Sequence, residues 1–145
     1  MSQEGLTFNP VTRESALPGT DEAGEFAPEL ASLREAAPPA PWCSYLAYEA
    51  GRAVALGLFK APPTASGEVE IAYLTFASHE GRGVAKRVAA HLVELAGEHG
   101  AKLVSAHTLP EENASTRVLQ ANSFVRDGWG EDEEAGRVWR WILPL

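Results

Sequence analysis

The sequence predicts a single domain of mixed α/β class, with one central sheet covered by helices on both faces. Three consecutive segments with strand-like patterns precede a long amphipathic helix, and that helix leads into a further strand. Strands on either side of such a helix are expected to be parallel, because a strand, helix, strand unit returns in the same direction. The 145 residues, 45% of them hydrophobic, suit one core, and we place the domain at 1–145.

The N-terminal segment, 1–41, is rich in Gly, Pro, Ala and Glu and is the least defined part of this prediction. Only residues 6–8 and 27–36 suggest a short strand and a short helix. The sequence leaves open how firmly this segment joins the core.

Three strands follow as an antiparallel meander. The runs 44–48 and 54–59 flank Glu49-Ala50-Gly51-Arg52, which is typical of a hairpin turn. A loop with two prolines interrupts the pattern, and the run 68–76 then resumes it as the third strand.

A helix is expected over 83–99, because Val84, Val88, Leu92 and Leu95 recur at helical spacing. Glycines near residue 100 end it. The remaining elements expected, in chain order, are a strand at 102–107, a helix at 114–121, a strand at 124–127, an acidic turn at 131–134 and a closing strand at 137–142.

The turn that joins the strand at 68–76 to the long helix reads His79-Glu80-Gly81-Arg82-Gly83-Val84-Ala85. The first N–H groups of a helix have no intrahelical partner and carry partial positive charge, so an anion binds there readily. Glycines let the backbone bend and let a ligand approach the amides. This turn alone is equally consistent with a phosphate site and with an ordinary tight connection.

Residues 70–124 resemble the central part of the GNAT superfamily of acetyl-CoA-dependent N-acetyltransferases. The family's phosphate loop, Gln/Arg-x-x-Gly-x-Gly/Ala, is matched in frame by Glu80-Gly81-Arg82-Gly83-Val84-Ala85. The run Asn113-Ala114-Ser115-Thr116-Arg117-Val118-Leu119, continuing to Phe124, is similar to a segment of the ribosomal-protein-alanine-acetyltransferase-like branch. The chain departs from the family at Glu80, at Ser123, and at Leu119, where some branches carry a tyrosine acid.

The resemblance implies a GNAT-like three-layer fold with a mixed, mostly antiparallel sheet that splays between 68–76 and 102–107. It implies acetyl-CoA as co-substrate, with its arm in that gap. The residues implied in binding it are Thr75, Phe76, Glu80, Gly81, Arg82, Gly83, Val84, Ala85, Lys86 and Asn113. For Asn113, the residues alone leave open a second role as the cap of the following helix.

The activity implied is transfer of acetyl to a primary amine by direct attack. Glu70 is the candidate base, with a surface ion pair to Lys102 or Arg117 as the alternative. Ser115 is the candidate to hydrogen-bond the departing thiol, and its alternative role is the first turn of a helix. The other function to consider is a non-catalytic protein of the same fold that binds acyl-CoA or a protein partner.

Composition excludes several function classes. The net charge of −8 argues against nucleic-acid binding and suits a cationic acceptor, either a small molecule or a peptide. No stretch approaches a membrane span or a signal peptide, and the single Cys43 suits a reducing compartment, so a cytoplasmic protein is expected.

The histidines show no metal-ligand spacing, and we expect no metal. His91 and His99 are expected to face solvent, and His79 and His107 are expected to be structural more often than functional. A homodimer through the strand at 139–145 is compatible with the sequence.

Overall fold

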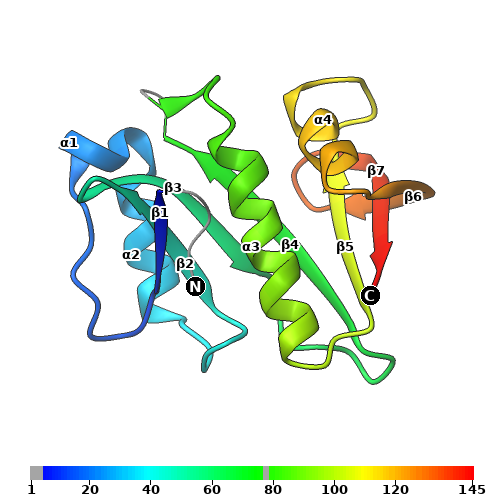
Figure 1. Cartoon of the computed structure of the whole chain (residues 1–145), viewed down its shortest axis with the longest axis horizontal. Helices are drawn as coiled ribbons and strands as arrows, with labels where there is room; N and C mark the ends of the chain where they lie inside the picture. The colour runs from blue at the N-terminus through cyan, green and yellow to red at the C-terminus, as the bar shows by residue number, and fades with distance from the viewer. Residues whose placement is uncertain (1–4, 77–78) are drawn as a thin grey trace.

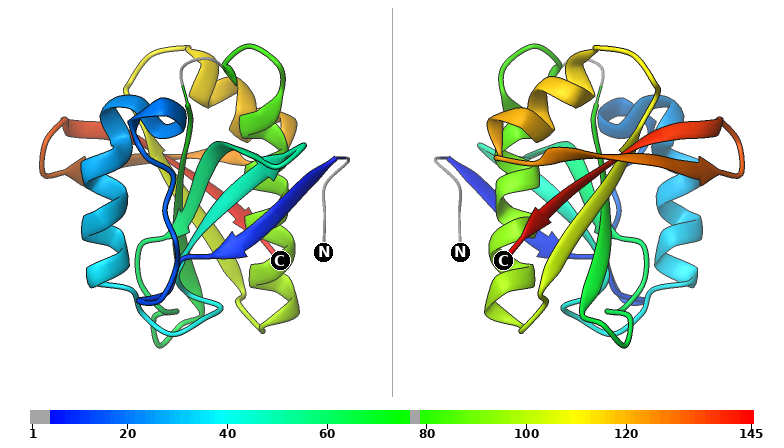
Figure 2. Two further views of the ribbon diagram at one scale, coloured as in Figure 1. Left: turned by 90° about the vertical axis from the view of Figure 1, so that its left-hand side faces the viewer. Right: turned by 90° about the vertical axis from the view of Figure 1, so that its right-hand side faces the viewer.

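The computed structural model describes residues 5–76 and 79–145, and within them seven strands form one mixed sheet in the order β1-β2-β3-β4-β5-β7-β6 (Figure 1). The strands are β1 (Leu6–Pro10), β2 (Ser44–Glu49), β3 (Arg52–Phe59), β4 (Glu68–Thr75), β5 (Leu103–Thr108), β6 (Val125–Asp132) and β7 (Gly136–Pro144). The helices are α1 (Thr20–Ala23), α2 (Ala27–Glu35), α3 (Val84–Glu98) and α4 (Ala114–Ala121), with a 3-10 turn, η1 (Gly24–Phe26), between α1 and α2. Figure 2 shows α1 and α2 on one face of the sheet and α3 and α4 on the other, which confirms the predicted three layers.

The N-terminal segment belongs to the domain core. β1 pairs antiparallel with β2, and Leu6 and Leu30 are fully buried. Glu22 of α1 accepts a hydrogen bond from the backbone N–H of Ala53 at 2.7 Å. The short helix α1 was not predicted, because a single helical turn carries no readable periodicity.

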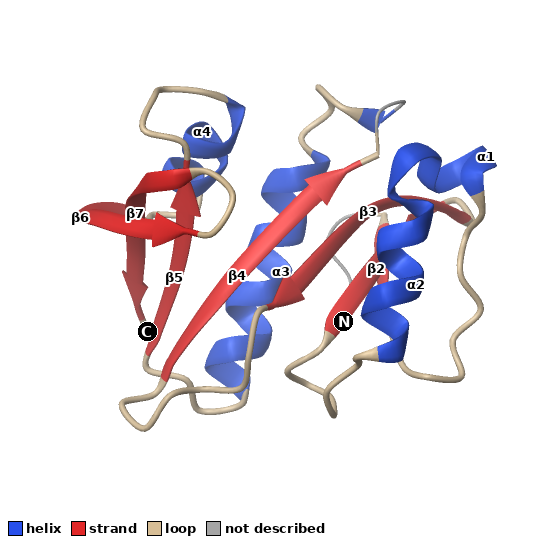
Figure 3. Cartoon of the chain, turned by 180° about the vertical axis from the view of Figure 1, so that it is seen from behind, coloured by secondary structure: helices blue, strands red, loops and turns tan. Residues whose placement is uncertain are grey.

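The meander of β2, β3 and β4 is antiparallel, as predicted, with the hairpin turn at Ala50 and Gly51. β4 and β5 are parallel, also as predicted. The two strands pair only from Glu68 to Glu70, and the last pair is Glu70 opposite Ser105. β4 then continues to Thr75 while β5 turns away along β7, so the sheet opens between them (Figure 3).

The C-terminal strands differ in part from the prediction. β7 lies between β5 and β6 and pairs with both, so the expectation that 137–142 closes the sheet was wrong and β6 is the edge strand. β6 also extends to Asp132, beyond the expected 124–127. The Asp132 carboxylate accepts hydrogen bonds from the backbone N–H groups of Glu134 and Ala135, which moves the turn toward the C-terminal end of the acidic run.

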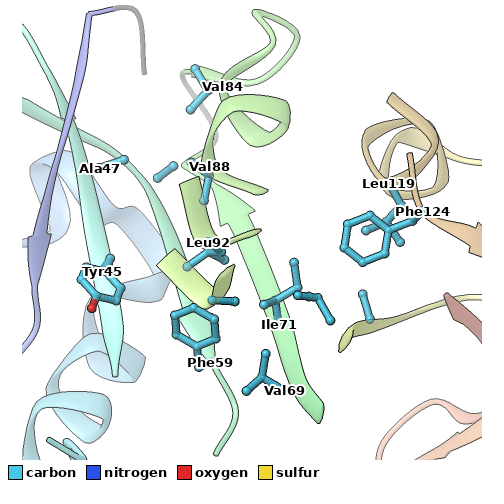
Figure 4. Close-up of a cluster of buried hydrophobic side chains, with 14 of the residues drawn as sticks. Tyr45, Ala47, Phe59, Val69, Ile71, Val84, Val88, Leu92, Leu119 and Phe124 are labelled. Carbon is cyan, nitrogen blue, oxygen red and sulfur yellow. The ribbon is translucent and has the colours of Figure 1, made fainter. Parts of the chain in front are cut away.

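Two hydrophobic cores lie on opposite faces of the sheet. Val69 and Ile71 of β4 pack under α3, whereas Leu74 and Phe76 belong to the core beneath α1 and α2. Figure 4 shows the first of these cores, with Leu119 of α4 beside Phe124. This division follows from the alternation of side chains along a strand.

His91 is buried, and the expectation that it faces solvent was wrong. Its ring is only 4% exposed and stacks on Phe8 of β1, with the ring centroids 3.8 Å apart. Its Nδ1 atom is buried without a hydrogen-bond partner among the described residues, and burial lowers the pKa of the imidazole. The sequence pattern missed this because β1 covers a side of α3 that helical spacing alone assigns to solvent. His99 is exposed, as expected.

Candidate functional site

A cleft of about 760 Å³ opens where β4 and β5 separate. Its walls come from the end of β4, the loop into α3, the first turn of α3 and one side of α4, and Phe26 of η1 also contributes. The long connection from β4 to α3 and the parting of the sheet therefore produce one cavity.

The first turn of α3 presents unpaired amides to this cleft. Gly81 and Gly83 have φ values of 80° and 75°, in the left-handed region that favours glycine. Gly83 is the N-cap residue, no described side chain caps the helix, and its first turn contains no acidic residue. Val84, Ala85 and Lys86 line the cleft, and the N–H groups of a first helical turn have no intrahelical acceptor. Such an end binds anions.

The charges around this helix end are mixed. Glu80, the acid that departs from the family loop, lines the cleft and is exposed. Lys86 and Arg117 also line it, and both are exposed. Arg117 was not predicted as a cleft residue. Its place at the fourth residue of α4, on the side that lines the cleft, is a consequence of helix packing that the sequence does not specify.

Most of the residues predicted to bind the cofactor line the cleft. They are Thr75, Glu80, Gly81, Gly83, Val84, Ala85 and Lys86, and the candidate Ser115 lines it as well. Phe76, Arg82 and Asn113 are not among the lining residues.

The backbone of Phe76 is not free for a ligand. Its side chain is 1% exposed, and its N–H group donates to the carbonyl of Val54 at 2.9 Å. Its carbonyl accepts from the backbone N–H of His79 at 2.8 Å, so the expectation of unpaired backbone groups at Phe76 was wrong for both groups. Because successive residues of a strand direct their backbone groups to opposite sides, those of Thr75 point away from β3, toward the opening.

Arg82 points away from the cleft. Its Nη2 atom donates to Oε1 of Glu49 at 2.8 Å and lies 3.2 Å from Nδ1 of His79. The hydrogen bond from Arg82 lowers the pKa of the Glu49 carboxyl. This contact fixes the loop before α3 to the end of β2.

Asn113 has the capping role that the sequence left open. Its Oδ1 accepts from the backbone N–H of Thr116, and the Thr116 hydroxyl accepts from the backbone N–H of Asn113, both at 3.0 Å. This reciprocal pair begins α4 and places Ser115 in the first turn.

Tyr73 meets Ser115 across the cleft. The Tyr73 hydroxyl donates to the carbonyl of Ser115 at 3.2 Å and lies 3.2 Å from its Oγ. Burial raises the pKa of the Tyr73 phenol. No sequence signal links Tyr73 to Ser115, which is 42 residues away along the chain. Leu119, at the position of the family's tyrosine, is fully buried in the core.

Glu70 lies on the other face of β4, at the point where the strands part. Its Oε2 atom is 3.1 Å from Nζ of Lys60 and 3.3 Å from Nδ1 of His107. The predicted alternative, an ion pair to Lys102 or Arg117, had the wrong partners. A Cβ atom at Gly130 would lie 2.5 Å from Nε2 of His107, so glycine there leaves room for the imidazole.

Residues 5–76 and 79–145 contain neither a metal-binding cluster nor a membrane-spanning helix. No group of three or more His, Cys, Asp or Glu side chains is arranged to hold a metal ion. Over the same residues, no helix has the length and apolar character needed to cross a membrane.

The fold is shared with solved acetyltransferases. The IAA acetyltransferase from Bacillus cereus ATCC 14579 superposes with a TM-score of 0.72 at 16% identity, covering 97% of this chain and 99% of that one. AAC(6')-Ib, solved with ribostamycin and coenzyme A, gives 0.72 at 18% identity over 97% of this chain and 93% of that one.

RimJ and RimL share the fold over a smaller part of this chain. RimJ from Mycobacterium smegmatis, solved with CoA-disulfide, gives a TM-score of 0.63 at 17% identity over 70% of this chain. The chain spans 52% of the length of RimJ and 62% of that of the ribosomal L7/L12 acetyltransferase RimL. None of the curated proteins compared with the sequence matches it.

The model of the acetyltransferase (GNAT) family matches residues 11–124, which include β2 to β5, the glycine loop, α3 and α4. The matched region contains every wall of the cleft. Together with the fold, this match shows that the chain belongs to the acetyltransferase (GNAT) family.

Proposed function

We propose that this protein transfers an acetyl group from acetyl-CoA to a primary amine. The observation that carries the proposal is the uncapped first turn of α3, whose amides line a cleft at the opening of the sheet. Lys86 and Arg117 add positive charge there. Neighbours of the same fold were solved with coenzyme A, which supports this choice of co-substrate.

The residues that line the cleft fit acetyl-CoA. The amides of Val84 and Ala85 would hold the pyrophosphate, and the backbone of Thr75 would pair with the amide-bearing arm as an added strand does. When bound, the co-substrate supplies an activated acetyl thioester. Glu70 lies where β4 and β5 part, so its carboxylate would face an acetyl group held in that opening.

Glu70 is the proposed base. An amine is protonated near neutral pH and must lose a proton before its nitrogen can attack a carbonyl carbon. The Glu70 carboxylate accepts that proton, and His107 beside it at 3.3 Å holds the carboxylate in place. As the N–C bond forms, the C–S bond breaks and its electron pair goes to sulfur. The net charge of −8 favours a cationic acceptor.

We propose that the protein is located in the cytoplasm, which is a reducing compartment. The sequence contains one cysteine, Cys43, which is buried, and burial raises the pKa of its thiol. A buried thiol with a raised pKa is unreactive, and the sequence contains no second cysteine with which Cys43 could form a disulfide.

Calorimetric titration with acetyl-CoA tests the proposal. The wild type should bind in the micromolar range that is common for enzyme substrates. Gly83→Glu places a carboxylate at the N-cap of α3 and should weaken binding at least 10-fold. Gly83→Ala is the matched control, because it shares the strain of φ 75° without the charge. Absence of binding to the wild type would refute the proposal.

A non-catalytic binding protein is the second candidate, because Glu80 lies in the cleft and Leu119 replaces the family's tyrosine. Glu70→Gln separates the two functions. An enzyme should retain acetyl-CoA affinity in this variant and lose about 10²-fold to 10⁴-fold of its rate. If the wild type binds acetyl-CoA but acetylates no amine across a panel of polyamines, amino sugars and peptides, the binding function is favoured.

A further inference from the structure

The cleft contains one of the chain's three tyrosines, and it comes from β4. The Tyr45 hydroxyl donates to the carbonyl of Pro41 at 2.7 Å, and Tyr48 lies on β2. Neither of these lines the cleft, whereas Tyr73 does. The one phenol that lines the cleft therefore comes from a strand of the sheet. On α4, Leu119 stands where the family carries a tyrosine, and its side chain is buried in the core.

Tyr73 and Glu70 lie on opposite faces of β4. Side chains alternate along a strand, so Tyr73 shares the α3 and α4 face with Ile71, while Glu70 points to the other face. Glu70 is the last residue of β4 that pairs with β5, and Tyr73 lies further along β4, where the strand lines the cleft. A thioester in this opening would have its acetyl side toward Glu70 and its sulfur side toward Tyr73.

The Tyr73 hydroxyl is already ordered as a donor. It donates to the Ser115 carbonyl at 3.2 Å, and the Ser115 hydroxyl, also 3.2 Å away, is placed to donate to the phenol oxygen. Because burial raises the pKa of Tyr73, the phenol remains protonated near neutral pH. The group is a neutral hydrogen-bond donor on the cleft wall.

We propose that Tyr73 is a catalytic residue that donates a hydrogen bond to the sulfur of CoA as the C–S bond breaks, and that Ser115 is the positioning residue that orients the phenol. This inference rests on the proposed function and changes the role of Ser115, which acts through Tyr73. In this step the O–H group turns from the Ser115 carbonyl to the sulfur while the phenol oxygen keeps the hydrogen bond from the Ser115 hydroxyl.

The proton stays on the phenol. A thiol has a pKa of about 8.5 and a phenol about 10, so a phenol does not lose its proton to a thiolate in this range. The electron pair of the C–S bond goes to sulfur, and the thiolate accepts the hydrogen bond. It takes its proton from water as the product leaves, while the nitrogen loses its protons to Glu70 and to water.

The test uses the complex with CoA and needs no acceptor. The ultraviolet absorbance of the thiolate gives the pKa of the bound CoA thiol, and the complex with desulfo-CoA, which lacks the sulfur, supplies the baseline for Cys43 and the tyrosines. Tyr73→Phe should raise the pKa of the bound thiol by about one pH unit, since a hydrogen bond to a charged group is worth about 10-fold or more. Ser115→Ala should shift it in the same direction by less.

Affinities supply the second measurement. Above the pKa of the thiol, Tyr73→Phe should bind CoA about 10-fold more weakly and desulfo-CoA with unchanged affinity. Tyr48→Phe, which removes a hydroxyl outside the cleft, should leave both values unchanged. An unchanged thiol pKa in Tyr73→Phe would overturn the inference. The inference would also be overturned if Tyr73→Phe weakened the binding of CoA and desulfo-CoA equally, because that result would indicate a packing role for the ring. Absence of CoA binding in the wild type would refute the proposed function as well.

Discussion

Gly57 of β3 lies directly against α3, and substitution of it by alanine should destabilise the protein. A Cβ atom at Gly57 would lie 2.6 Å from Cγ1 of Val88 and 3.1 Å from Cδ1 of Leu92. The optimal separation of two carbon atoms is about 3.5 to 4.0 Å, so the contact with Val88 is too short by about 1 Å. Val88 and Leu92 are both at most 1% exposed, and buried side chains of this kind are closely packed.

The magnitude follows from overpacking of a dense core. Insertion of an extra methyl group into such a core costs about 1 to 3 kcal/mol. For a domain of this size, that loss lowers the melting temperature by about 2 to 4 °C per kcal/mol. Because α3 must move outward, the amides at its first turn should move as well, and the affinity for acetyl-CoA should fall.

Urea denaturation and thermal unfolding are the assays. Gly97→Ala is the matched control on α3, because the nearest atom to its Cβ is Cδ1 of Leu145 at 4.0 Å. It should stabilise the protein by about 0.5 to 1 kcal/mol, the helix preference of alanine over glycine. Val88→Ala removes the clashing methyl groups, so the double variant should be more stable than the sum of the two single effects predicts. If Gly57→Ala unfolds at the same urea concentration as the wild type, the argument for close packing of α3 on β3 is refuted.

Three other changes test separate parts of the structure. Asn113→Ala removes the cap of α4 and should lower the free energy of unfolding by about 1 kcal/mol in urea titrations, while acetyl-CoA affinity stays within about 2-fold, and a larger loss of affinity would assign Asn113 to the site. His91 has a pKa lowered by burial, so below its ordinary pKa of about 6.5 the unfolded state binds the proton more readily and stability falls with decreasing pH. Melting temperatures of the wild type at about pH 7.5 and 5.5 should therefore differ more than those of His91→Phe, and equal slopes would contradict the buried neutral imidazole. The Arg140 guanidinium lowers the pKa of Glu68 through hydrogen bonds of 2.9 and 3.2 Å, so this stabilisation is present above the ordinary pKa of the carboxyl and is lost as pH falls through the folded value. Arg140→Met should cost about 1 kcal/mol at neutral pH, since both groups are about a quarter exposed, and should cost less once Glu68 is protonated, because only the pair of Arg140 with Asp127 then remains. A loss that is independent of pH would refute an electrostatic origin.

The sequence alone determined the features that depend on near neighbours. The period of Val84, Val88 and Leu92 predicted α3, and the glycine loop before it predicted the helix end that lines the cleft. Alternation predicted the meander, and the strand, helix, strand order predicted the parallel pair. The resemblance of residues 70–124 to the GNAT superfamily was confirmed by the family match. Each of these patterns lies within one helix, one turn or two adjacent strands, where local sterics and hydrogen bonding fix the geometry.

Only the tertiary structure decided which side chains meet. Tyr73 and Ser115 are 42 residues apart, and Arg140 and Glu68 are 72 apart, so no local pattern relates them. Glu70 pairs with Lys60 and His107 because β3 and β5 flank β4 where the sheet opens. His91 is buried because β1 joins the sheet edge and brings Phe8 against α3. The order of β6 and β7 depends on which of the two strands pairs with the free edge of β5, and in this protein that strand is β7. Local propensity fixes the elements of this protein, whereas the long-range packing of those elements selects the partners of each polar group, and those partners form the site.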